Sequence, residues 1–283
     1  MTTWDRKNYE VPDARLVQAE REIYRTFGDM VSIDAKGKSL TKFGKSGELG
    51  TSRETVWSLG GMETYVSTNT IDTISSTSTL DDQEIYLECH TVTGTGEDQQ
   101  FSFMTQVISL NGQNKVTLPT PVARISRVFN NNGSELAGAV YVYEDTTVVN
   151  GVPSDLTKVH AHIPLGFQQS FKAATTFSNE DYYILTGGFG SVTYKQAGAV
   201  NFYLEIREAG KIFREVAALS ANSAGGAWQI DLDPAVVIPK NADIRITCQT
   251  ATQGSEVYAS FQGYIAKVVT WLQQILQFKK LVI

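Results

Sequence analysis

The feature that most constrains the fold of this chain is an alternation of apolar and polar residues with a period of two, repeated in several short segments after about residue 62. Ile85, Leu87 and Cys89 show it first, and the pattern returns over residues 202–207, 244–249 and 257–265. Successive side chains of a strand point to opposite faces, so an antiparallel sheet that is buried on one face produces this alternation. The sequence therefore predicts a mainly β body.

Dipeptides that favour tight turns lie between these segments. Asn111-Gly112, Asn132-Gly133 and Asn150-Gly151 are typical of two-residue β-hairpins. Repeated short strands joined by such turns are typical of an antiparallel β-sandwich or jelly roll. A seam near Pro153–Pro164 would divide the body into a first β unit over residues 62–155 and a second over residues 156–268.

Both ends of the chain show a helical period in place of the alternation. A helix is predicted over residues 12–28, and a short amphipathic helix over residues 269–283 that is too short and too polar to span a membrane. The apolar stripes consist of Leu16, Ile23 and Phe27 in the first helix and of Trp271, Ile275, Phe278 and Val282 in the second. Helices of this length are not stable alone in water, so each stripe needs a surface to cover, on its own β body or on another chain.

The segment between the first helix and the β body reads as an extended arm, so that residues 1–61 form an N-terminal helix and arm. Residues 29–61 are rich in glycine and hold few apolar anchors, of which Phe43 and Trp57 are the largest. A long segment with so little core of its own is typical of an interface or of a mobile connection. Phe43 and Trp57, together with the two helical stripes, are therefore predicted to contact a partner chain.

Charge and cysteine content limit the partners and the compartment. The net charge is −6, which disfavours nucleic acid as a partner. Cys89 and Cys248 both fall on the apolar phase of an alternating segment, which favours buried thiols over a disulfide. The first residues contain no apolar stretch of the secretory kind, and no apolar run is long enough to span a bilayer. We expect synthesis in a reducing cytoplasm and no membrane insertion.

Three patterns resemble ligand sites but are incomplete. Gly37-Lys38-Ser39 matches the end of a phosphate-binding loop, but Ser32 stands where that loop requires glycine. His160 and His162 would share one face of a strand, but no third metal ligand lies nearby, which favours two half-exposed polar side chains. Asp231 and Asp233 precede a proline that favours a turn over a calcium loop. No cofactor and no metal is predicted.

No motif for nucleophilic or acid–base catalysis is present, so the chain is predicted not to be an enzyme. Two of the 30 acidic residues could still meet in space as a glycosidase-like pair, and this alternative stays open. The strand aromatics Tyr141/Tyr143 and Tyr182/Tyr183 could bind a glycan, although their place in alternating segments favours ordinary strand residues.

A series of short motifs resembles a family of virion structural proteins of tailed phages. The first block comprises Lys42-Phe43-Gly44, Gly50-Thr51, Glu54-Thr55-Val56-Trp57, Gly60-Gly61 and Tyr65. The later blocks comprise Leu110-Asn111-Gly112-Gln113, Val116-Thr117-Leu118, the segment from Val122 to Phe129, Ala209 to Arg214 and Val237 to Ile244. The resemblance covers roughly residues 42–266 and leaves out both predicted helices.

The resemblance implies a structural component of a tailed-phage virion, made in the host bacterial cytoplasm. The form it most favours is a capsid decoration or cement protein, a homotrimer that binds the major capsid protein or other virion proteins and stabilises the assembled shell. The alternative is a tail, baseplate or head-fibre component that acts as an adaptor or host-contact module. An enzyme such as a surface depolymerase would need a catalytic pair that the sequence does not reveal.

Overall fold

The computed structural model describes residues 37–47, 49–193, 199–221, 226–250 and 254–267. These residues form antiparallel β-strands and two short 3₁₀ turns, η1 (Gly96–Asp98) and η2 (Leu156–Lys158), which confirms the prediction of a mainly β fold. The helices predicted over residues 12–28 and 269–283 lie outside the described residues. Within the described part of the chain, no helix is long and apolar enough to cross a membrane.

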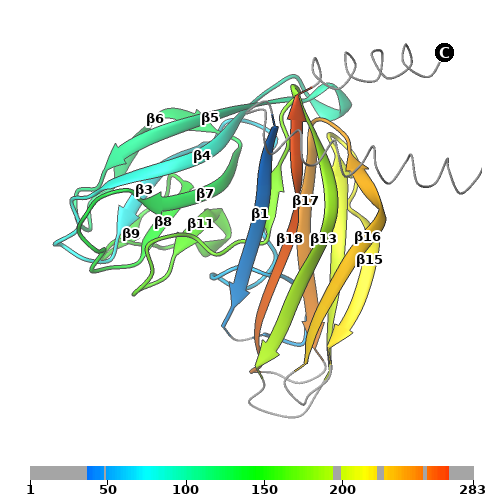
Figure 1. Ribbon diagram of the computed structural model, residues 1–283. Helices are drawn as coiled ribbons and strands as arrows, with labels where there is room; N and C mark the ends of the chain where they lie inside the picture. Colours follow the sequence, from blue (N-terminus) through cyan, green and yellow to red (C-terminus); the bar gives the residue numbers. More distant parts are fainter. Residues whose placement is uncertain (1–36, 48, 194–198, 222–225, 251–253, 268–283) are drawn as a thin grey trace, which may run out of the picture.

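Eight strands, several of them far apart in the sequence, form a double sheet that we call the jelly-roll unit (Figure 1). They are β1 (Gly37–Ser46), β12 (Ala174–Thr176), β13 (Asp181–Thr193), β14 (Val200–Glu208), β15 (Arg214–Ala221), β16 (Ala227–Ile238), β17 (Ala242–Thr250) and β18 (Glu256–Lys267). The first sheet has the order β1-β18-β13-β16 and the second the order β12-β17-β14-β15, with β2 (Glu54–Thr55) added to β17. If these eight strands are numbered in chain order, the sheets read 1-8-3-6 and 2-7-4-5, which is the strand order of a jelly roll.

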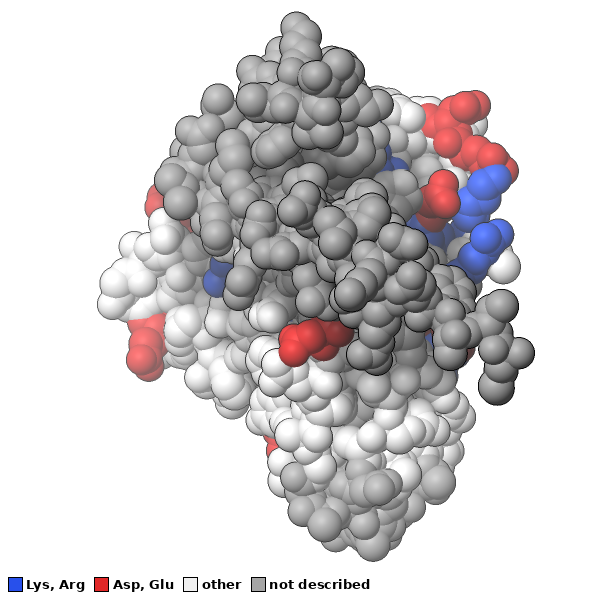
Figure 2. Space-filling model, turned by 45° about the vertical axis from the view of Figure 1, so that its right-hand side comes forward, with Lys and Arg blue, Asp and Glu red and all other residues white. Residues whose placement is uncertain are grey.

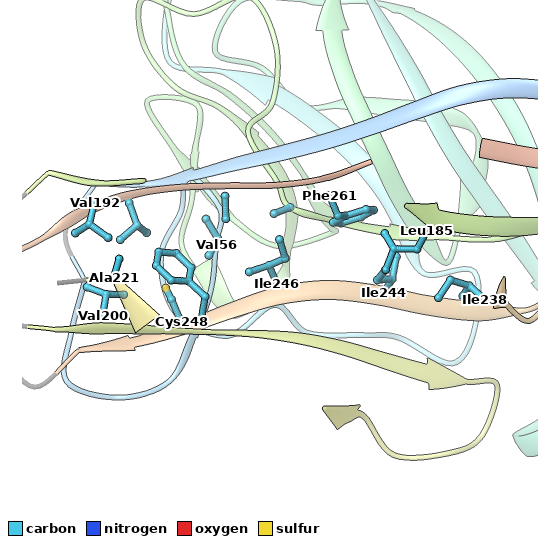
Figure 3. Close-up of a cluster of buried hydrophobic side chains, with 14 of the residues drawn as sticks. Val56, Leu185, Val192, Val200, Ala221, Ile238, Ile244, Ile246, Cys248 and Phe261 are labelled. Atoms are coloured by element: carbon cyan, nitrogen blue, oxygen red, sulfur yellow. The ribbon is translucent and has the colours of Figure 1, made fainter. Parts of the chain in front are cut away.

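The core of the jelly-roll unit lies between its two sheets. Leu185 and Phe261 come from the first sheet, Ile244 and Cys248 from the second, and their side chains point toward one another (Figure 3). All four are at most 1% exposed. The alternation predicted for residues 244–249 and 257–265 arises because one face of each strand lines this core.

The remaining strands form the inserted unit between β1 and β12, a second, smaller double sheet with a separate two-stranded hairpin of β9 and β10. They are β3 (Ile71–Ser76), β4 (Glu84–Thr93), β5 (Gln100–Ser109), β6 (Val116–Val122), β7 (Arg124–Asn130), β8 (Val140–Glu144), β9 (Val148–Val149), β10 (Val152–Pro153) and β11 (Val159–Ile163). One sheet has the order β11-β8-β3-β6 and the other β5-β4-β7. Side chains from both sheets, such as Ile74, Leu87 and Val142, make a separate core. In Figure 1 this unit stands beside the jelly-roll unit.

The two units do not follow the division drawn from the sequence. Residues 37–46, assigned there to the arm, are β1, and all ten pair with β18. The alternation missed this strand because, apart from the half-buried Leu40, its inward positions are Lys42, Gly44 and Ser46 instead of apolar residues. At the other boundary, β11 was assigned to the second unit but pairs with β8 of the inserted unit. The jelly roll is therefore discontinuous in sequence.

The predicted turns had mixed outcomes. Asn150 and Gly151 have φ values of 51° and 78° and connect β9 to β10, as a two-residue hairpin requires. A side chain at Gly151 would also place a Cβ 1.7 Å from the backbone oxygen of Ser76. The other two dipeptides, at residues 111–112 and 132–133, instead connect strands of different sheets. Asp233-Pro234 does not form the predicted turn but lies inside β16, where the register against β13 shifts.

Candidate functional site

The first block of motifs in the family resemblance, from Lys42 to Tyr65, lies where the two units meet, and we call this region the joint. Glu54 accepts hydrogen bonds from the backbone N–H groups of Gly50 at 2.5 Å and Gly61 at 3.0 Å. Trp57 is 3% exposed, and its Nε1 donates to the backbone oxygens of Gly60 at 2.8 Å and Gly61 at 3.0 Å. The block therefore folds onto itself through groups that its own residues supply.

Gly44 lets β1 approach the rest of the joint. A Cβ at this position would lie 2.0 Å from the backbone oxygen of Val56 and 2.5 Å from the backbone nitrogen of Ala173. Those two residues are joined by a hydrogen bond of 2.9 Å from Ala173 N to Val56 O. The glycine is needed because three backbone segments meet where a side chain would stand.

A buried carboxylate holds the units together. Asp243 of β17 is 2% exposed and accepts hydrogen bonds from Arg124 Nε at 3.0 Å and Thr176 Oγ1 at 2.6 Å. Arg207 of β14 forms a second ion pair with it. Burial opposes the charge, but the two guanidinium groups outweigh it and lower the pKa of Asp243 to about 2. Because Arg124 belongs to β7 of the inserted unit, this ion pair spans both units.

The arginines around this carboxylate stack on Tyr65. The guanidinium carbons of Arg124, Arg207 and Arg245 lie 5.0, 4.4 and 5.8 Å from the centre of its ring. Arg245 is in turn paired with Glu205 at 2.8 Å. The negative face of an aromatic ring attracts cations, so Tyr65 adds to the carboxylates in offsetting the positive charge.

A second ion pair, between the segments that lead into and out of the inserted unit, is equally buried. Lys172 Nζ lies 2.6 Å from Glu63 Oε1 and donates to the backbone oxygen of His160 at 3.0 Å. Both charged side chains are no more than 5% exposed. The joint thus consists largely of paired charges. Such pairs fix the relative positions of their residues, because separating them would leave each charge buried without a partner.

Beside the joint, a cleft of about 560 Å³ opens between the units. Strand β1 and the segment after β12 form one wall, and β4, β5 and β7 form the other. At its floor, Lys42 Nζ donates to the backbone oxygen of Ser126 at 2.6 Å and lies 3.9 Å from Glu88. Burial lowers the pKa of Lys42 to about 7.

The floor of the cleft also contains a serine beside a histidine. Ser126 Oγ lies 3.5 Å from His90 Nδ1 and accepts a hydrogen bond of 2.9 Å from Thr175 Oγ1. Burial lowers the pKa of His90 to about 3, so it is neutral at physiological pH and a weak base. Because the distance from Ser126 Oγ to His90 Nδ1 is long for a hydrogen bond and the imidazole is a weak base, these two side chains are suited to polar packing rather than to activating a nucleophile.

Of the residues predicted to contact a partner, the structure describes two. Phe43 is 38% exposed and packs edge-to-face on Phe171, with ring centres 5.5 Å apart. Trp57 instead makes its contacts inside its own chain, in the joint. Leu16, Ile23, Phe27, Trp271, Ile275, Phe278 and Val282 lie outside the described residues.

Sequence reasoning did not identify the charged groups of the joint. Arg124, Asp243 and Lys172 are far apart in the chain and belong to no recognised ligand spacing. Asp243 falls on the polar phase of the alternating segment 244–249, opposite to the core residues Ile244, Ile246 and Cys248. Its position in the sequence therefore gives no signal that the carboxylate is buried.

The histidine pair serves packing in the described structure. A register shift between Val159 and Ala161 breaks the strand alternation on which the shared face depended. His160 Nε2 lies 3.3 Å from Glu144 Oε1, whereas His162 stacks on Tyr141 with ring centres 4.7 Å apart. Among the described residues, no group of three or more histidine, cysteine, aspartate or glutamate side chains could hold a metal ion.

The two cysteines are free thiols, as the sequence predicted. Both are fully buried, Cys89 in the core of the inserted unit and Cys248 in that of the jelly-roll unit. Burial raises the pKa of Cys89 to about 11 and that of Cys248 further still. Thiols of this kind are poor nucleophiles at neutral pH.

Comparison with known proteins gives no family. No family model matches the chain, and no curated protein matches it. Among solved structures, the infectious bursal disease virus Gt strain particle aligns over 82% of this chain and 73% of that chain, with 10% identity and a TM-score of 0.23. The VP2 subviral particle of the same virus aligns over 82% and 72%, with 11% identity and a TM-score of 0.21. Scores this low carry no argument about fold or function.

Proposed function

We propose that this chain is a structural component of a tailed-phage virion, in particular a capsid decoration or cement protein that binds the assembled shell. The observation that carries the proposal is that the motif block resembling virion structural proteins coincides with the joint of a jelly-roll body. Jelly rolls occur in viral capsid and lectin domains and in cupins, so the topology alone does not choose among functions. The motif block favours the first of these.

The joint gives the body the rigidity that such a role needs. The pair of Asp243 and Arg124 crosses between the units, and the pair of Lys172 and Glu63 joins the two segments that lead into and out of the inserted unit; each pair is almost fully buried. Two units locked in one orientation can contact neighbouring subunits at fixed positions. A protein that binds only the assembled shell stabilises it by mass action, without catalysis.

The surface also suits assembly into a homotrimer. Val216 on β15, the last strand of its sheet, is 47% exposed, and Ile212 just before that strand is 75% exposed. Charged residues, Arg214 and Glu215 among them, lie beside these two side chains, whereas the described residues over the lower part of Figure 2, away from the start of β15, are mainly uncharged. Uncharged surface is less costly to remove from water than charged surface, which favours its burial between subunits. The proposed partners are other copies of this chain and the major capsid protein.

The test is the copy number in purified particles. Quantitative mass spectrometry of the chain relative to the major capsid protein should give hundreds of copies per virion for a decoration protein. A dozen copies or fewer would reject the shell position in favour of the tail, baseplate or head-fibre alternative. Absence from the particle would reject the virion role altogether.

A further inference from the structure

We propose that the cleft between the two units binds a neutral saccharide. The cleft has a volume of about 560 Å³, within the range of small-molecule sites. Its position is fixed from both sides, because the buried ion pairs of the joint hold its two walls in place. A preformed concave site costs little ordering on binding.

Hydroxyl and amide side chains are the commonest polar groups that line the cleft. The side chains of Ser39, Thr41, Ser102 and Asn179 line it and make no hydrogen bond to any other described residue. Such groups can both donate and accept, except that a carboxamide divides these roles between its nitrogen and oxygen. They match a ligand that presents several hydroxyl groups.

An aromatic ring stands at the rim of the same cleft. Phe103 is 49% exposed and is held by an edge-to-face contact with the buried His90, at 5.4 Å between ring centres. An aromatic ring offers a flat apolar surface at little conformational cost. The C–H face of a pyranose ring is apolar and can pack on such a surface, while its hydroxyl edge reaches the polar wall.

The charges of the cleft argue against an ionic ligand. Two cationic side chains, Lys42 and Arg127, line it together with two acidic ones, Glu88 and Glu180. Lys42 is committed to Ser126 and lies near Glu88, and Arg127 donates to Gln169 Oε1 at 2.7 Å. With both cations engaged and the pKa of Lys42 lowered to about 7 by burial, a phosphate or another anion gains little, whereas a neutral polyhydroxylated ligand is not opposed by the carboxylates.

Saturation-transfer difference NMR on the full chain tests this with methyl α-glucoside, methyl β-galactoside and N-acetylglucosamine as probes. At least one should receive saturation, and Phe103→Ala should weaken its binding by about tenfold or more. Asn179→Ala should weaken it as well. Phe189→Ala is the matched control, because Phe189 is 51% exposed and lies on β13, outside the cleft. This variant should bind the sugar as the unchanged chain does.

Circular dichroism and urea unfolding of each variant establish that the fold is intact. No saturation of any probe by the full chain would overturn the proposal. Displacement of the sugar by inorganic phosphate, or equal loss of binding in the Phe103 and Phe189 variants, would also overturn it. The proposal does not depend on the position of the chain in a virion, so its failure leaves the proposed function untouched.

Discussion

Asp243 and Arg124 form a buried ion pair where the two units meet. Replacing Asp243 by Asn leaves the buried Arg124 and the half-buried Arg207 without this counter-ion. Removing one member of a buried pair typically costs about 3–5 kcal/mol, because the other charge stays desolvated. We expect Asp243→Asn to lower the free energy of unfolding by about that amount, measured by urea denaturation.

The matched control is the exposed pair of Lys115 and Asp145, whose side chains are 40% and 60% exposed. Solvent screens such a pair, so Asp145→Asn should cost less than about 1 kcal/mol. If the Asp145 and Asp243 variants proved equally stable, the ion pairs of the joint would not be what holds the units together.

Lys42 makes the stability depend on pH in a defined window. Its pKa falls from 10.5 in the unfolded chain to about 7 in the folded protein, because it is buried. Between these values the unfolded chain holds a proton that the folded chain has lost, so stability from this group rises with pH above about 7. Below that pH Lys42 is protonated in both the folded and the unfolded chain, so the folded protein bears the full cost of burying its ammonium charge.

Urea unfolding of the unchanged chain and of Lys42→Met, compared between pH 7 and pH 8.5, measures this effect. The range ends below the ordinary pKa of 9.0 of the cysteines in the unfolded chain, so these thiols stay mostly protonated. The increase in stability should disappear in Lys42→Met but persist in Lys115→Met, since Lys115 is exposed. An unchanged slope in Lys42→Met would mean that another group titrates.

At the scale of the elements, the packing of β1 depends on Gly44. Gly44→Ala places a methyl group against the backbone of Val56 and Ala173, where no flexible side chain can yield. Overpacking of this kind typically costs about 1–3 kcal/mol. Gly47→Ala is the control, because nothing lies within 4 Å of its Cβ position. Thermal unfolding should show a clear loss for Gly44→Ala only; equal melting temperatures would show that β1 can shift away freely.

The elements that the sequence predicted well are those with apolar inward faces. Strands β4, β14, β17 and β18 coincide with the alternating segments, because their inward residues fill a core. Strand β1 was missed because Lys42, Gly44 and Ser46 face inward, for a cross-unit hydrogen bond and a close backbone approach. Proline at position 234 suggested a turn, but β16 is an edge strand whose shifted register tolerates it.

At the scale of the whole molecule, local sequence patterns could not predict a jelly roll whose strands are discontinuous in the sequence. The partner of β1 is β18, more than 200 residues away, and nothing near residue 40 specifies that pairing. The cleft is invisible to the sequence for the same reason: Lys42, Ser126 and Thr175 meet only after three distant strands are placed. Sequence reasoning therefore gave the fold class and the strands with apolar inward faces, but not the order of the sheets or the residues of the site.

The last prediction concerns the two ends of the chain, which the sequence assigns to contacts between chains. The jelly roll has all eight strands between β1, which begins at Gly37, and β18, which ends at Lys267. A chain shortened to residues 1–268 should therefore keep the β-type circular dichroism spectrum and unfold near the same urea concentration. Without the stripe of Trp271, Ile275, Phe278 and Val282, it should form fewer trimers in light scattering and bind particles weakly. A chain beginning at residue 37 tests Leu16, Ile23 and Phe27 in the same way. If both shortened chains form trimers and bind particles as the full chain does, the ends are not the anchors.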